Sequence, residues 1–70
     1  MVIGDRVVIT EPKHFLFNLE GSLIGFRGEK SPGDVWLLIL VDTRNRSYLI
    51  PQSMVKLVSE EDYIKNMQEH

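Results

Sequence analysis

The longest apolar run in the chain covers residues 35–41 and stands between two aspartates. Seven residues are too few to cross a membrane and are typical of a β-strand. Because side chains alternate between the two faces of a strand, both faces of this one are apolar. One face carries Val35, Leu37, Ile39 and Val41, and the other carries Trp36, Leu38 and Leu40. The first face can fill the interior of a small β-domain, so the second must be covered by another part of the chain or by a partner.

Shorter segments with strand character lie on both sides of this run. β-Branched and alternating apolar residues predict further strands at 5–10, 21–26, 47–50 and 55–58. Turns are predicted at 28–33, which is rich in glycine and proline, and at 43–46, where Asn45 suits a left-handed backbone. Residues 51–54 predict a single 3₁₀ turn, and Gly25 predicts a bulge or sharp bend within its strand.

This spacing of strands and turns predicts an all-β fold, a small five-stranded antiparallel SH3-like barrel. The alternation places Val7, Ile9, Leu23, Leu37, Ile39 and Leu57 in its core. The apolar segment 13–20 is expected to fold back and close one end of that core. Within it, Phe15 and Phe17 have two interpretations: they close the barrel, which we favour for so small a domain, or they form a stacking platform for single-stranded nucleic acid.

The last residues change from strand to helix periodicity. Ser59 precedes three acidic residues and has the character of a helix N-cap, because acids are favoured in the first turn of a helix. We therefore predict a barrel over residues 1–58 and a short helical tail over 59–70. One face of this helix carries Tyr63, Ile64 and Met67, the nearest cover in the chain for the outer face of strand 35–41.

Charge argues against a strong nucleic-acid binder. Residues 59–70 hold four acids and one lysine, a net charge of −3, so residues 1–58 carry +1 of the total of −2. Arg44 and Arg46 share one turn, which is either a solvated turn or a contact for an acidic surface or a phosphate. The N-terminus shows neither a secretory signal nor a membrane span, so we expect a cytoplasmic protein without membrane insertion.

The chain lacks the residue patterns of common catalytic and metal sites. There is no cysteine, and His14 is the one histidine in residues 1–58, without the spacing of a zinc motif. No serine stands in a recognisable elbow or triad pattern. The sequence thus predicts no enzyme, no metal and no cofactor.

The first third of the chain resembles a known family. Residues Gly4-Asp5-Arg6-Val7-Val8-Ile9, Pro12, Phe15-Leu16-Phe17-Asn18 and Gly21-Ser22-Leu23 are similar to the opening of photosystem I reaction-centre subunit IV, and Gly4-Asp5-Arg6-Val7 is similar to the variable chain of ferredoxin–thioredoxin reductase. Both families are SH3-like barrels. Where the photosystem family carries basic residues associated with ferredoxin docking, this sequence has Val8 and Glu11.

The resemblance implies a non-catalytic accessory or adaptor subunit in photosynthetic electron transfer, at the cytoplasmic or stromal side of a membrane. Its partner would be a protein, such as a membrane electron-transfer complex. The candidate contact residues are Trp36, Leu38, Leu40, Arg44 and Arg46. Two alternatives stay open: an RNA- or ribosome-associated barrel, and a homodimer formed through the outer face of strand 35–41.

Overall fold

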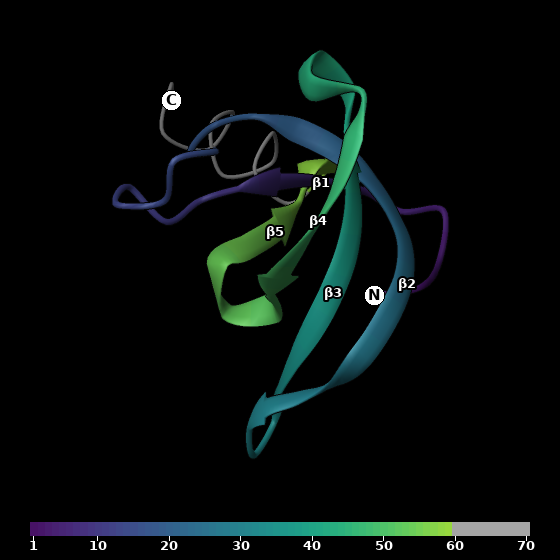
Figure 1. The fold of residues 1–70 in the computed structure, drawn as a ribbon, viewed down its shortest axis with the longest axis vertical. Coiled ribbons are helices and arrows are strands. Elements are labelled where there is room, and N and C mark those ends of the chain that lie inside the picture. Colours follow the sequence, from purple (N-terminus) through teal and green to yellow (C-terminus); the bar gives the residue numbers. More distant parts are fainter. Residues whose placement is uncertain (60–70) are drawn as a thin grey trace.

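The computed structural model describes residues 1–59, which contain five β-strands and two single-turn 3₁₀ helices (Figure 1). The strands are β1 (Arg6–Ile9), β2 (Glu20–Ser31), β3 (Asp34–Val41), β4 (Arg46–Pro51) and β5 (Val55–Leu57). The 3₁₀ helices are η1 (Asp42–Arg44) between β3 and β4, and η2 (Gln52–Met54) between β4 and β5. All five predicted strands are present, and η2 confirms the predicted 3₁₀ turn.

The strands form one antiparallel sheet in the order β4-β3-β2-β1-β5. This confirms the predicted all-β, antiparallel class. β1 pairs with both β2 and β5, so the start of the chain is held by the last strand, with Val7 opposite Leu57. β2 and β3 form a long, curved ribbon that extends well past the shorter strands (Figure 1).

The boundary of β2 differs from the prediction. The sequence predicts a strand that ends at residue 26 and a turn over 28–33, whereas β2 continues to Ser31 and leaves Pro32 and Gly33 as the turn. The glycine that suggested a turn, Gly28 with φ of 66°, instead lies within β2, where the register shifts between Phe26 and Glu29. A positive φ and an irregular register are features of a bulge, and bulges carry the same glycine signal as turns.

The irregularity predicted at Gly25 is confirmed. Leu23 lies opposite Ile39, and Gly25 lies opposite Leu38, so two steps along β2 match one step along β3. Ile24 is the extra residue of this bulge. Because a bulge bends its strand and increases the local twist, it contributes to the curvature of the β2–β3 ribbon.

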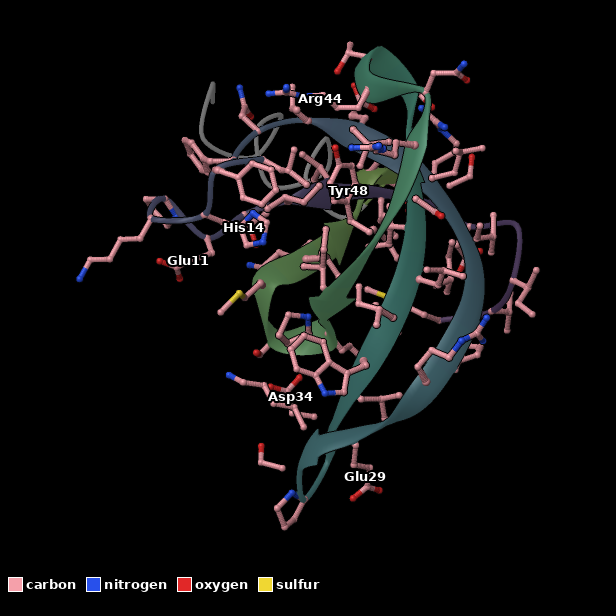
Figure 2. All side chains as sticks on the ribbon, in the orientation of Figure 1. Glu11, His14, Glu29, Asp34, Arg44 and Tyr48 are labelled. Atoms are coloured by element: carbon pink, nitrogen blue, oxygen red, sulfur yellow. The ribbon has the colours of Figure 1, made fainter. Side chains whose placement is uncertain are left out.

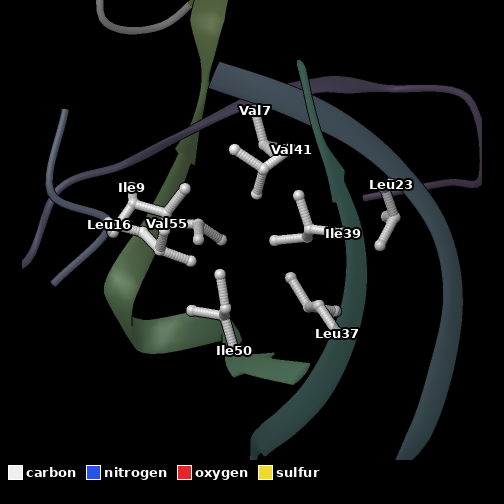
Figure 3. Packing of buried hydrophobic residues seen from close by; sticks show 9 residues of the cluster. All are labelled: Val7, Ile9, Leu16, Leu23, Leu37, Ile39, Val41, Ile50 and Val55. Carbon is white, nitrogen blue, oxygen red and sulfur yellow. The ribbon is translucent and has the colours of Figure 1, made fainter. Parts of the chain in front are cut away.

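The core lies on the concave side of the sheet (Figure 3). Its buried members are Val7, Ile9, Leu16, Leu23, Leu37, Ile39, Val41, Ile50 and Val55. Five of the six predicted core residues are therefore confirmed. The sixth, Leu57, is half-buried and packs against the cluster from the end of β5, where the sheet covers it on one side only.

The segment between β1 and β2 closes the core, but through a different residue from the predicted ones. Leu16 is fully buried, while Phe15 and Phe17 are 69% and 46% exposed. The path of the backbone determines which side chain of the loop points inward. The amide of Asn18 donates to the carbonyl of Ile9 over 2.8 Å, and this hydrogen bond folds the loop back onto β1. The prediction that the two phenylalanines close the barrel is thus wrong.

The predicted helical tail falls almost entirely outside the described residues, since only Ser59 belongs to residues 1–59. The division at residue 58 and the cover provided by Tyr63, Ile64 and Met67 stay predictions.

Candidate functional site

The predicted apolar residues of β3 form the centre of an exposed surface on the convex side of the sheet. Leu40 is 39% exposed, and Trp36 and Leu38 are half-buried. Their alternation with the buried Leu37 and Ile39 confirms the predicted split of the strand into two apolar faces.

Two residues that the sequence analysis did not select extend this surface. Leu49 on β4 lies directly opposite Leu38 and is 50% exposed. Ile24, the extra residue of the β2 bulge, follows the inward-pointing Leu23 and is 41% exposed. Leu38 and Leu49, which are directly opposite each other, lie within about 5.5 Å at Cβ, and Trp36 and Leu40 follow Leu38 on the same side of β3. We call this surface the outer face: Ile24, Trp36, Leu38, Leu40 and Leu49.

Alternation could have revealed both additions. Leu49 stands between Tyr48 and Ile50, which contribute to the core side, and Ile24 follows Leu23, which is also a core residue. The same period-two argument that selected the β3 residues therefore assigns Leu49 and Ile24 to the outer face.

A polar network borders the outer face at one end. The guanidinium of Arg6 forms an ion pair with Asp42 and also donates to the hydroxyl of Ser22 over 2.9 Å. The hydrogen bond from Arg6 lowers the pKa of the Asp42 carboxyl, and the same bond raises the pKa of Arg6. These contacts link β1 to β2 and to η1. Because the ion pair lies at the surface, its role is to position these three elements locally.

The two arginines of the β3–β4 connection do not lie on the outer face. Arg44 ends η1, and Asn45 follows it with φ of 50°, which confirms the predicted left-handed residue. Arg46 pairs with Val41, so it points to the same side of the sheet as Tyr48. Both arginines are exposed, and within residues 1–59 neither forms an ion pair. The structure thus separates the five predicted contact residues into an apolar surface and a basic turn.

An acidic group lies near the other end of β4 (Figure 2). Asp34, at the start of β3, accepts hydrogen bonds from the amide of Ser53 over 2.9 Å and from its hydroxyl over 2.8 Å. The hydrogen bond from the Ser53 amide has the larger effect and the hydrogen bond from the Ser53 hydroxyl the smaller one, and both lower the pKa of the Asp34 carboxyl. The carboxylate is therefore ionised at neutral pH and held in place beside η2.

Aromatic rings meet beside the loop that closes the core. Phe15 stacks on His14 with ring centroids 5.0 Å apart and meets Tyr48 edge-on at 5.7 Å. Figure 2 shows His14 and Tyr48 on the same side of the molecule, below Arg44. Nδ1 of His14 accepts a hydrogen bond from the amide of Leu16 over 3.0 Å, which orients the ring.

Within residues 1–59, no group of three or more histidine, cysteine, aspartate or glutamate side chains is placed to bind a metal ion. In the same part of the chain, no helix has the length and apolar character needed to span a membrane. Comparisons of the chain with models of protein families, with curated proteins and with solved structures gave no match.

Proposed function

We propose that this chain is a non-catalytic adaptor that works by protein–protein contact through the outer face. The observation that carries the proposal is the exposure of the apolar side chains of the outer face in a chain of only 70 residues. A large exposed apolar patch on a small monomer marks an interaction site, because leaving it in water is unfavourable.

The chemistry of the outer face suits a protein partner. Its residues are aliphatic apart from Trp36, and buried tryptophans are frequent anchors at the centre of interfaces. The Arg6–Asp42 pair stands beside it as part of a polar rim, which is the usual arrangement around an apolar interface core.

For the wider setting we propose an SH3-like barrel in photosynthetic electron transfer, on the cytoplasmic or stromal side of a membrane. The resemblance of residues 4–27 supports this setting, together with the five antiparallel strands. Ferredoxin docking is not part of the proposal, because Val8 is only 7% exposed and Glu11 is acidic where the family has basic residues. The contact proposed here uses the outer face instead.

A second candidate function is RNA association, which the exposed phenylalanines favour. Phe15 and Phe17 are both exposed, and Phe15 touches Tyr48 on the strand that begins with Arg46. Bases stack on exposed aromatic rings, and arginine side chains contact phosphates. The near-neutral charge of residues 1–58 argues against strong binding of this kind, because such affinity depends on neutralising many phosphates.

Capture from native lysate, with and without nuclease, separates the two candidates. The chain is immobilised at about 0.15 M salt, where surface charges more than about 8 Å apart are largely screened. We expect a protein to be retained equally in both arms and to be lost when Leu40 and Leu49 are replaced by serine. Retention that disappears with nuclease and with Phe15→Ala, but survives the two serine substitutions, would contradict the adaptor proposal and favour RNA association.

A further inference from the structure

The sheet has three stretches of strand whose outer edge pairs with no other strand within residues 1–59. They are β5, the part of β2 beyond Leu23, and β4. Exposed strand edges can pair with other chains, and natural proteins usually protect them by making them short, bulged or charged.

Two of the three edges are protected in this way. β5 has only three residues. The free part of β2 contains three register shifts, the left-handed Gly28 and the charged residues Arg27, Glu29 and Lys30. Each of these features disfavours regular pairing with another strand.

The edge of β4 has none of these protections along its centre. β4 pairs with β3 in six consecutive positions without a register shift, from Trp36 opposite Pro51 to Val41 opposite Arg46. Its central residues, 47–50, are uncharged, and Ser47 and Leu49 are exposed. β4 is therefore the edge whose geometry allows a regular sixth strand.

The charges at the two ends of β4 are opposite in sign. Arg44 and Arg46 stand at its beginning and have no ion-pair partner within residues 1–59. The Asp34 carboxylate, held by Ser53, stands just beyond its end, and Figure 2 shows Arg44 and Asp34 far apart along this strand. A surface with a positive and a negative end complements itself when it is turned through a two-fold rotation.

We propose that β4 pairs antiparallel with β4 of a second copy of this chain, so that the basic turn of each copy faces Asp34 of the other. This inference goes beyond the proposed function, because it uses an edge of the sheet and leaves Trp36, Leu38 and Leu40 of the outer face free.

The register follows from the length of the strand. If Leu49 of one copy lies opposite Leu49 of the other, the side chains of both strands keep their faces, and Arg46 lies opposite Gln52, one residue before Ser53 and its bound Asp34. The paired strands are about 20 Å long, so the two charged contacts lie at opposite ends and do not repel each other. Such a pairing is small for an interface, so we expect a weak dimer that forms as concentration rises.

Sedimentation equilibrium of the full chain between about 10 µM and 1 mM tests this dimer. We expect the wild type to self-associate, and more weakly as salt increases. The double substitution Arg44→Glu, Arg46→Glu and the single substitution Asp34→Lys should each raise the dissociation constant by about tenfold or more, because each places like charges together. Arg27→Glu, Lys30→Glu on the protected edge of β2 is the matched control and should change it less than about twofold.

Mixing the two reversed variants gives the decisive readout. In a mixed pair, the new glutamates of one copy face the new lysine of the other, and the native arginines face the native Asp34. Association should therefore return in the mixture, and hydrogen exchange at β4 amides should slow as the dimer forms. A chain that stays monomeric at about 1 mM overturns the inference, as does a dimer that ignores the charge reversals. Protection, in a monomer, of the β4 amides that point away from β3 would show that another part of the chain occupies the edge, which also overturns the inference.

Discussion

Replacing Gly21 by alanine is expected to lower the free energy of unfolding by about 2–3 kcal/mol. Gly21 lies opposite Val41 on the core side of β2, and an added Cβ would stand 2.4 Å from the carbonyl oxygen of Leu40 and 2.8 Å from a methyl group of Ile39. The first of these contacts is with backbone, which cannot rotate away, so β2 and β3 would have to separate. For so small a domain, this loss is a large part of the total stability.

Gly25→Ala is the matched control on the same strand. The nearest atoms to its added Cβ are the movable end of Arg27 at 3.4 Å and the Leu38 side chain at 3.8 Å, both ordinary distances. We expect the free energy of unfolding to stay unchanged or to rise by about 0.4–1 kcal/mol, because alanine restricts the unfolded chain more than glycine does. Urea denaturation followed by the fluorescence of Trp36, the one tryptophan, measures both variants. If both substitutions lower the free energy of unfolding equally, the β2–β3 register is not the one described.

The second large effect is expected at Ile39, in the middle of the core side of β3. Ile39 is fully buried between Leu23 and Tyr48, its partners across the two neighbouring strands. Ile39→Ala should cost about 2–5 kcal/mol, because it removes buried methyl groups and leaves a cavity that the rigid strands cannot fill.

The next residue provides the control, because it points to the opposite side of the same strand. Leu40 is 39% exposed, so Leu40→Ala should change the free energy of unfolding by less than about 1 kcal/mol. The same urea titration compares the two variants. If Leu40→Ala is as destabilising as Ile39→Ala, the outer face is buried within the monomer and is not available to a partner.

The strands and the core could be predicted because both depend on local periodicity. Alternation in residues 35–41 separates Leu37 and Ile39 from Trp36, Leu38 and Leu40, whatever the neighbouring strands do. The length of β2 could not be predicted in this way. Glu29 belongs to a strand because it pairs with Val35 across the hairpin, and the glycines around it give the same local signal for a bulge as for a turn.

The candidate site was predicted in part for the same reasons. The β3 residues of the outer face follow from alternation, whereas the placement of Phe15 and Leu16 depends on where the loop returns to β1. No period within that apolar loop indicates which side chain points inward. The predicted contact residues include both Arg46 and Leu40, but the register opposite Val41 turns Arg46 to the other side of the sheet.

Photo-crosslinking from the outer face tests the proposed protein contact most directly. A benzophenone amino acid is placed at position 40 in the source cells, and the control carries it at Lys56, an exposed position on β5, which β2 and β1 separate from β3. We predict a covalent adduct with a protein from position 40 that withstands nuclease, and no such adduct from position 56. Adducts of equal yield from both positions, or an adduct from position 40 that nuclease removes, would contradict the claim that the outer face binds a protein partner.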